Sequence, residues 1–379
     1  MKIEHFKMVS RFDDWRFSFI PQIFGLLYFW LLIFKYELNF EILKLLGLSF
    51  ITSVGFASIG YLINEFFDQK SDALVGKKNQ LINASIAQKL TYFFISLSLT
   101  FIPWLLLPSN TLTWVLISLQ LAVYFLYNAP PFRLKNHPFF SILLDASYAY
   151  LIPFILSGNT YYLGAKTIKI HLGVFILFAS ILFLVGLRNI FLHLIDDYFF
   201  DNQNGRISLP KILGVNKSKL LLITIFSLEF ILLISVSILL SSYYRLFLIL
   251  LFIALFYLFG IFIRIKKDYK YFILDSSFCS KSNAIYQIYF PLICLSTLCL
   301  EAPLWSILVP IHLLTLIPKS YILRLKGLLK FIFKEIVSKG IRNMMSKIVN
   351  YSIYYLFLIV GVNLKKEQKS ALEFLRKQK

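Results

Sequence analysis

Charged side chains are scarce in this chain of 379 residues: they make up 15% of it, whereas hydrophobic residues make up 58%. Soluble globular domains carry about 25% charged residues. The shortage of charge, together with a mean hydropathy of +0.73, excludes an ordinary soluble domain. This composition is typical of an integral membrane protein with several membrane-spanning segments.

The alternating segments of about ten residues that build transmembrane β-barrels are absent from the sequence. Near-continuous apolar runs of about 17 to 25 residues predict spanning helices instead. Because a backbone in lipid must satisfy its hydrogen bonds internally, these runs predict an all-α bundle of nine transmembrane helices. The predicted spans are 17–34, 43–63, 90–107, 111–127, 139–157, 171–195, 219–240, 244–263 and 284–300, with a shorter candidate tenth span at 303–317.

Cysteine is also rare, with three in the chain. Cys294 and Cys299 are separated by about 140° around a helix axis, which is poor disulfide geometry. We therefore expect them and Cys279 to be free thiols. No small-residue cleavage site follows the first span, so we expect a retained helix and not a signal peptide.

Acidic residues are few: the chain has 19 Asp and Glu against 39 Lys and Arg, a formal net charge of +20. Such an excess can indicate a nucleic-acid partner, but here the basic residues crowd every second connection between spans. By the positive-inside rule these connections and the N-terminus are cytoplasmic, and we expect no nucleic-acid partner. The crowded connections contain Lys70, Lys77, Lys78 and Lys89; Arg133 and Lys135; Arg206, Lys211, Lys217 and Lys219; and Arg264, Lys266, Lys267, Lys270 and Lys281.

Two of the few acidic clusters share a period of four residues. One is NEFFDQKSD, residues 64–72, where the second span ends, and the other follows the sixth span. On a helix, successive members of such a set are displaced by about 40° and about 6 Å, so each set forms one polar stripe. The first stripe consists of Asn64, Asp68 and Asp72, and the second of Asn189, His193, Asp197 and Asp201.

The two stripes together predict a metal site at the cytoplasmic side of the membrane. Facing helix ends with four carboxylates would carry roughly −4, which is repulsive unless cations lie between them. Paired oxygen ligands suit Mg²⁺ bound through the phosphates of a substrate. Each cluster alone fits a solvated acidic helix end, but the matching period of the two favours a functional site.

Basic residues near the stripes are candidate substrate contacts. In YNAPPFRLK, 127–135, the two prolines stop any helix and bring Arg133 and Lys135 to the same cytoplasmic mouth. Both side chains are candidates for contacting a diphosphate, and for Lys135 a role as a positive-inside anchor is an equal alternative. Lys77 and Lys78 are further phosphate contacts or solvated loop charges.

The two Asp motifs and YNAPPFRLK, in this order, resemble the UbiA superfamily of intramembrane prenyltransferases. The resemblance covers about residues 11–300 and includes Gly205, Leu209, Pro210 and Gly214 after the second motif. It implies a nine-helix bundle around a central cavity that opens to the cytoplasm and, laterally, to lipid. It also implies Mg²⁺-dependent transfer of an isoprenyl group from an isoprenyl diphosphate to a lipophilic acceptor.

By position, the resemblance implies one metal site at Asn64, Asp68 and Asp72 and another at Asp197 and Asp201. Loss of diphosphate would leave an allylic carbocation, which an electron-rich acceptor captures. Aromatic faces can stabilise such a cation. The chain has 40 Phe and 22 Tyr, but aromatic residues also pack helices and form interfacial belts.

The chain departs from the family pattern in both motifs. Glu65 stands where the family often has Asp, and Asn189 and His193 stand where it often has Tyr and Lys. His193 is a candidate to replace the lysine as a diphosphate contact or to act on the acceptor. Arg188, one residue off the stripe, is a candidate for the missing charge, and Asn189 for a substrate contact.

Two further acids lie within predicted spans. Asp145 lies about two turns into the fifth span, where it could reach the cavity and meet an acceptor hydroxyl, or form a hydrogen bond between helices. For Glu229, deeper in the seventh span, we expect the hydrogen bond between helices.

The chain divides into a cytoplasmic segment, 1–16, a transmembrane prenyltransferase domain, 17–300, and an extension, 301–379. The extension combines a short hydrophobic segment with Lys and Arg every three or four residues among Leu, Ile and Phe. That pattern fits a helix on an anionic membrane surface or a tail that binds a protein partner.

The acceptor is not identified by the sequence. An Arg-rich run after the first motif is lacking, which argues against haem-type farnesylation and leaves small cyclic or aromatic acceptors. A second hypothesis is phosphoribosyl-type transfer from a sugar diphosphate to a polyprenyl phosphate, which polar pocket groups would favour. A third is a cation transporter with an acidic cytoplasmic cavity.

Overall fold

The structure, a computed structural model, describes residues 3–74, 76, 79–165, 172–196, 208–267 and 282–316. The described residues form helices and no strands, as the apolar runs predict. The α-helices are α1 Ile3–Val9, α2 Phe12–Ile33, α3 Phe40–Leu74, α4 Ile86–Phe101, α5 Thr111–Asn128, α6 Phe140–Ala146, α7 Ile152–Gly164, α8 Leu172–Asp196, α10 Leu209–Ser241, α11 Phe247–Lys267, α13 Phe290–Glu301 and α14 Leu308–Leu316. Short helical segments are η1 Ile102–Leu105, η2 Leu134–Asn136, η3 Ser147–Leu151, η4 Ile285–Tyr289 and η5 Pro303–Ile307.

Six of the described helical segments are long and apolar enough to cross a membrane: Phe40–Leu74, Ile86–Leu105, Thr111–Asn128, Phe140–Gly164, Leu172–Asp196 and Asn216–Ser241. Four shorter apolar segments are Ser18–Ile33, Phe247–Gly260, Ile285–Glu301 and Pro303–Leu316. Each of these ten segments overlaps one of the nine predicted spans or the candidate tenth. The number of segments that cross the membrane stays a prediction.

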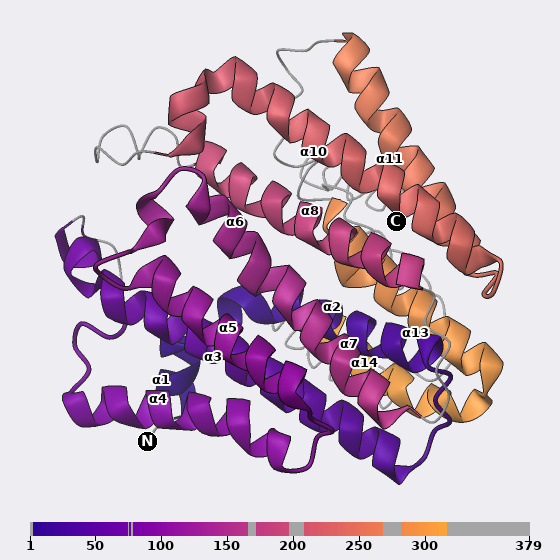
Figure 1. The fold of residues 1–379 in the computed structure, drawn as a ribbon, viewed down its shortest axis with the longest axis horizontal. Helices are drawn as coiled ribbons and strands as arrows, with labels where there is room; N and C mark the ends of the chain where they lie inside the picture. The colour runs from indigo at the N-terminus through magenta and orange to yellow at the C-terminus, as the bar shows by residue number, and fades with distance from the viewer. Residues whose placement is uncertain are drawn as a thin grey trace, which may run out of the picture. The chain divides into compact units, whose positions relative to one another are not determined.

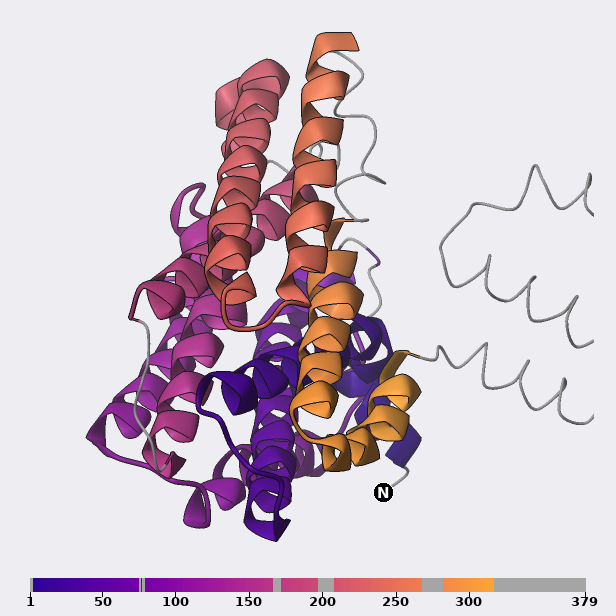
Figure 2. The same ribbon diagram turned by 90° about the vertical axis from the view of Figure 1, so that its right-hand side faces the viewer.

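Most of the helices pack around one core of buried residues between Ile23 and Leu308, and a smaller cluster joins Val9 of α1 to Leu62, Leu81 and Tyr92. α3 packs against α4 and α5, α8 against α6 and α10, and α2 against α13. In Figure 1, α3, α4 and α5 lie on one side of the bundle and α8, α10 and α11 on the other, with α6 and α7 between them. Figure 2 shows α10 and α11 running side by side. The chain divides after Leu316, and the second unit, 317–379, lies outside the described residues.

Two helices are interrupted by π-helical turns that precede prolines. η3 leads into α7, where Pro153 is near the first position, and η4 leads into α13 with Pro291. A proline has no N–H to offer the preceding turn, and its ring disfavours the regular α-helical register before it. A π turn absorbs this mismatch and rotates the neighbouring side chains. Tyr148 and Tyr150 on η3 and Tyr286 on η4 line the cavity described below.

Prolines and a glycine end other helices. α5 ends at Asn128, and Ala129 is extended before the Pro130–Pro131 pair, so the predicted stop is confirmed. Within α10, Gly214 has φ 73° and ψ 165°, a conformation that a side chain would strain. The continuous spanning part of α10 therefore begins after this glycine.

A buried ion pair joins α8 to α10. Arg188 Nε donates to Glu229 Oε2 at 2.6 Å, and both side chains are fully buried. The Tyr286 hydroxyl donates to the other Glu229 oxygen at 2.9 Å, while Arg188 Nη2 donates to Asn283 Oδ1 at 2.8 Å. The predicted interhelical bond of Glu229 is confirmed. Removing one partner of such a pair usually costs about 3–5 kcal/mol, because the other charge stays buried.

The two described cysteines form no disulfide, as predicted. Cys294 and Cys299 are free thiols on α13, and Cys279 lies outside the described residues.

Close packing of α3 against α4 depends on Gly55. A Cβ at this position would lie 2.5 Å from Thr100 N and 2.7 Å from Leu99 C. Both atoms belong to the α4 backbone, which cannot move without separating the helices. Gly47 lies on the same helix and has nothing within 4 Å of its Cβ position.

We predict that Gly55→Ala destabilises the protein by about 1–3 kcal/mol, because overpacked helices must separate. Gly47→Ala is the matched control and should be neutral or slightly stabilising, since alanine favours helix by about 1 kcal/mol over glycine. Thermal unfolding midpoints in detergent would compare the two. Equal midpoints for both variants would contradict the close approach.

Candidate functional site

The first stripe lies on the last turns of α3, as its period predicts. Asn64, Asp68 and Asp72 are half-buried, whereas Phe66 and Lys70, which lie between them in sequence, are exposed. The stripe therefore faces the bundle and not the surrounding solvent or lipid.

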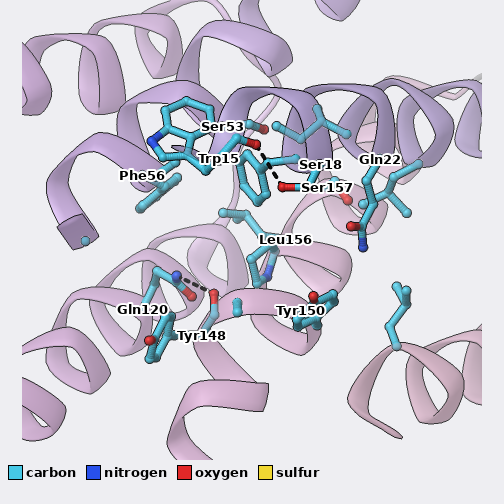
Figure 3. Close-up of a pocket in the computed structure, with 18 of the residues that line it drawn as sticks. Trp15, Ser18, Gln22, Ser53, Phe56, Gln120, Tyr148, Tyr150, Leu156 and Ser157 are labelled. Carbon is cyan, nitrogen blue, oxygen red and sulfur yellow. Dashed lines mark hydrogen bonds between the residues drawn. The ribbon is translucent and has the colours of Figure 1, made fainter. Parts of the chain in front are cut away.

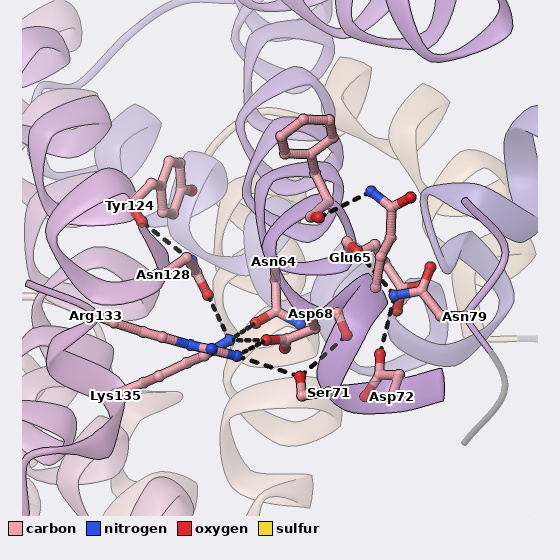
Figure 4. A network of polar contacts seen from close by, with 12 residues as sticks. Asn64, Glu65, Asp68, Ser71, Asp72, Asn79, Tyr124, Asn128, Arg133 and Lys135 are labelled. Atoms are coloured by element: carbon pink, nitrogen blue, oxygen red, sulfur yellow. Dashed lines mark hydrogen bonds and ion pairs between the residues drawn. The ribbon is translucent and has the colours of Figure 1, made fainter. Parts of the chain in front are cut away.

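Asp68 lies against two cations from the connection after α5 (Figure 4). Arg133 Nη2 is 2.7 Å and Lys135 Nζ 2.5 Å from the same oxygen, Asp68 Oδ1. Arg133 also donates to Ser71 Oγ at 3.2 Å, and Lys135 to Asn64 Oδ1 at 3.2 Å. The sequence predicts Arg133 and Lys135 at the same cytoplasmic mouth as the first motif, and in the structure their side chains lie together with that of Asp68.

The backbone at Arg133 accounts for this placement. Its φ is 38°, in the left-handed region that non-glycine residues adopt at a cost of about 1–2 kcal/mol. The turn reverses the chain after α5, so that the side chains of Arg133 and Lys135 converge on α3. Lys135 is 8% exposed and also donates to Asn128 Oδ1 at 3.3 Å. A buried ammonium needs such partners, which makes a purely solvated anchor role a poor description of Lys135.

Asp72 is held by Asn79, a residue that the sequence motifs do not include. Asn79 is 6% exposed; its Nδ2 donates to Asp72 Oδ2 at 2.9 Å and to the Glu65 carbonyl at 2.8 Å. Its Oδ1 accepts from the Leu81 N–H at 3.0 Å. A single asparagine in a polar connection carries no sequence signal that separates it from an ordinary turn residue.

Glu65, the departure from the family pattern, does not belong to the stripe. It is 5% exposed, and its Oε1 lies 3.9 Å from Arg11 Nη1 at the junction of α1 and α2. Glu65 therefore contacts the N-terminal helices through Arg11.

The second stripe is described in part. Asn189 and His193 line a cavity of about 580 Å³ that Asn64 and Asn128 line from the opposite helices. Asn189 Nδ2 donates to the Tyr150 hydroxyl at 2.7 Å, which fixes the amide against η3. The remaining predicted site residues, Asp197, Asp201, Lys77 and Lys78, lie outside the described residues.

Arg188 has a different environment from its neighbours on α8. It is fully buried in the pair with Glu229, and its Nη1 donates to Asn189 Oδ1 at 3.0 Å. It does not line the cavity, and its proposed contact with substrate stays a prediction. Through Asn189, however, it orients a residue that does line the cavity.

The cavity combines polar ends with aromatic walls. Trp15, Phe56, Tyr127, Phe178 and Phe290 contribute aromatic surface. Asp145 also lies on the wall, within reach of a bound molecule as predicted, and accepts a hydrogen bond from the Tyr148 hydroxyl. A cavity with these walls can bind an apolar chain and shield a reactive centre from water.

The described donors fit part of a magnesium site. Asp68 and Asp72 offer carboxylates and Asn64 an amide oxygen, which are ligands that Mg²⁺ prefers. Within the described ranges, no group of three His, Cys, Asp or Glu gathers as a metal-binding cluster. The chemistry of the donor set fits the metal, with Asp197 and Asp201 needed from the other side of the predicted site.

Comparisons with known proteins bear on the family and the fold. The profile of the UbiA prenyltransferase family matches residues 24–274. Three solved structures show the same fold: a digeranylgeranylglyceryl phosphate synthase (17% identity, TM-score 0.56, covering 78% of this chain and 97% of that one); a UbiA homologue from Archaeoglobus fulgidus bound to GPP and Mg²⁺ (16%, 0.55, 77% and 99%); and the apo UbiA homologue from Aeropyrum pernix K1 (17%, 0.53, 75% and 98%). No curated protein matches the chain.

We predict that Asn79→Ala weakens Mg²⁺ binding about five- to tenfold, because Asp72 loses the hydrogen bond that positions it. Titration calorimetry with Mg²⁺, in the presence of inorganic diphosphate, would measure the change. Asn39 provides a matched control, since it caps the opposite end of α3 through the Ile42 N–H at 3.0 Å. Asn39→Ala should leave Mg²⁺ affinity unchanged; equal affinities for wild type and Asn79→Ala would contradict the positioning role.

Proposed function

This chain belongs to the UbiA prenyltransferase family, and we propose that it transfers an isoprenyl group from an isoprenyl diphosphate to a small cyclic or aromatic lipophilic acceptor. The observation that carries the proposal is the convergence of Asp68, Arg133 and Lys135 beside a cavity that Asn64 and His193 line. Diphosphate recognition needs both carboxylates for metal and cations for phosphate oxygens. The Archaeoglobus homologue structures with GPP or DMAPP and Mg²⁺ support this donor class.

We place the site at the cytoplasmic face of a nine-helix bundle. The support is the crowding of basic residues in the connections next to both stripes, since such connections stay in the cytoplasm. A water-soluble diphosphate head group would then enter from the cytoplasm while its apolar chain enters the cavity.

The residues of the first stripe prepare the site for an anion. Without substrate, Arg133 and Lys135 neutralise Asp68. When a diphosphate binds, both cations can turn from the carboxylate to phosphate oxygens, and Arg133 is the more accessible of the two, with 30% of its side chain exposed against 9% for Lys135. Magnesium bound by Asn64, Asp68 and Asp72, and by the Asp197 and Asp201 pair, would neutralise the diphosphate and the charge that develops as it leaves.

The cavity walls serve the organic part of the reaction. Loss of diphosphate leaves a delocalised allylic cation, which aromatic faces such as Tyr127 and Phe178 can stabilise. The same walls exclude water, which would otherwise capture the cation and waste the donor. Acceptor attack then forms the new bond.

Phosphoribosyl-type transfer to a polyprenyl phosphate is the second candidate. One observation favours it: hydroxyl and amide side chains, including Ser53, Gln120 and Ser157, line the cavity beside its aromatic walls. Such groups suit sugar hydroxyls.

The proposed function is tested by incubating the protein in membranes with labelled isoprenyl diphosphates, with and without Mg²⁺, and identifying the lipid products. A parallel arm supplies labelled phosphoribosyl diphosphate and a polyprenyl phosphate. We expect Mg²⁺-dependent prenyl products. Turnover confined to the sugar donor would contradict the proposal.

We predict that Asp68→Ala, Asp72→Ala, Asp197→Ala and Asp201→Ala each lower activity more than tenfold, a loss above about 1.4 kcal/mol in transition-state stabilisation. The reason is that each removes a carboxylate from the proposed metal site. Glu41→Ala is the matched control, because Glu41 is an exposed acid at the start of the same helix as Asp68. Near-normal rates in two of the four variants would rule out the two-site assignment.

We predict that His193→Ala raises the apparent KM for the donor about tenfold, whereas His193→Lys restores most of the affinity. The physical reason is that His193 lines the cavity on the second stripe, where the family often has a lysine. Steady-state kinetics with varied donor would separate the roles. If both variants instead lose kcat with unchanged donor KM, His193 acts on the acceptor.

A further inference from the structure

The cavity has the same depth along two opposite helices. Its lining extends from residue 49 to residue 64 on α3 and from residue 178 to residue 193 on α8. A helix rises about 1.5 Å per residue, so fifteen residues span about 22 Å, which is the length of about four extended isoprene units at about 5 Å each. This depth limits the length of an extended chain inside the cavity if the far end is closed.

One end of the cavity is the candidate diphosphate site. Asn64 belongs to the first stripe, and the lining residues of α3 continue the face of that stripe at spacings of three or four positions. They include Ser49, Ser53, Phe56, Gly60 and Asn64. Figure 3 shows Ser53 and Phe56 on the wall of the pocket together with Leu156 of α7. A chain whose diphosphate lies at the stripe would therefore extend along α3 toward Ser49.

The other end of the cavity is closed by buried side chains. They come from α3, from η1 and the connection after it, from α7 and from α8, and they are Ser49, Trp104, Leu107, Thr160 and Phe178. Beyond Ser49, the same face of α3 continues with Leu45, which is buried in the apolar core and does not line the cavity. The cavity therefore ends inside the bundle at the level of Ser49.

Trp104 has the largest side chain at this end, and two hydrogen bonds in series hold its ring. Trp104 Nε1 donates to Thr52 Oγ1 at 3.0 Å, and Thr52 Oγ1 donates to the Thr100 carbonyl of α4 at 2.7 Å. Trp104 is 5% exposed and Thr52 is 6% exposed, so both bonds are shielded from water. Moving the indole aside would leave a buried N–H without a partner, which is costly. The indole therefore forms a fixed end wall.

We propose that Trp104 limits the isoprenyl donor to about four isoprene units, and that Thr52 positions the indole for this role. The proposal rests on the proposed function and narrows its donor class. A fifth unit would lengthen the extended chain past the end of the cavity and bring it against the indole. Such a clash is a repulsive element that discriminates against the longer donor. Shorter donors fit, but they cover less of the apolar wall and bind less tightly.

The test measures binding of labelled all-trans prenyl diphosphates of two to six isoprene units to the full chain in nanodiscs with Mg²⁺. Empty nanodiscs correct for partition of the donors into lipid. We expect the affinity to rise up to four units and to fall about tenfold at five. Equal affinities for four, five and six units would overturn the inference, because the chain would then leave the cavity for the lipid. Failure to bind any isoprenyl diphosphate would instead reject the proposed function, and this inference with it.

Trp104→Ala tests the end wall, because it removes on the order of 140 Å³, about the volume of one isoprene unit. We expect the affinity for the five-unit donor to rise about tenfold and that for the two-unit donor to stay unchanged. Trp114→Ala is the matched control, since Trp114 is 45% exposed, its ring centroid lies 6.4 Å from that of Trp104 and it does not line the cavity. It should keep the wild-type preference. An unchanged preference in Trp104→Ala would overturn the inference.

Two substitutions at Thr52 test the positioning role and disturb the packing less than Trp104→Ala does. Thr52→Val replaces the hydroxyl with a methyl group of similar size, so the indole loses its acceptor, and we expect the affinity for the five-unit donor to rise about threefold. Thr52→Ser keeps the hydroxyl and should keep the wild-type limit. Thermal unfolding midpoints would verify that both variants are folded. Equal donor preferences in the two variants would overturn the role of Thr52.

Discussion

A carboxylate at the end of an apolar bundle needs a counter-charge, and Asp68 has two, from Arg133 and Lys135. Burying one unpaired charge would cost several kcal/mol, so the connection after α5 is drawn onto α3. Together the two cations balance the carboxylates of Asp68 and Asp72 on the first stripe. Because Mg²⁺ and these side chains compete for one carboxylate, metal binding in our account releases the cations toward the phosphates. Asp68, Arg133 and Lys135 thus stabilise the substrate-free fold and, in our account, also determine the affinity for the diphosphate.

The two sides of the cavity are fixed by separate polar anchors. Lys135 joins Asn64 of α3 to Asn128 of α5, and the Arg188–Glu229 pair joins α8 to α10. Asn189 extends the second anchor to Tyr150 on η3. Each anchor is largely buried, so the residues that it joins hold their places. The cavity lies between these anchors, where a long flexible chain can be accommodated without disturbing either.

Much of the fold and part of the site follow from the sequence, because the membrane leaves few alternatives. Apolar length located the helices, period four located the first stripe, and the proline pair located the turn that carries Arg133. The side of a helix that a single residue faces was harder to predict. Arg188 is one residue from the stripe, and about 100° of rotation sends it to Glu229 instead of the cavity. Asn79 was missed because its importance comes from the carbonyl and carboxylate that folding places beside it. Trp104 was missed because a single tryptophan in an apolar run does not show that it lies at the end of a cavity.

The competition for Asp68 is tested most directly by the affinity of the substrate-free protein for Mn²⁺, a paramagnetic substitute for Mg²⁺, in wild type and Lys135→Gln. Lys44→Gln is the control, since Lys44 pairs with the exposed acid Glu41 far from the stripe. Electron paramagnetic resonance would measure free and bound Mn²⁺ with the protein in nanodiscs. Our account predicts about tenfold tighter Mn²⁺ binding in Lys135→Gln and no change in Lys44→Gln, because a competing cation leaves the carboxylate. Unchanged or weaker binding in Lys135→Gln would contradict it.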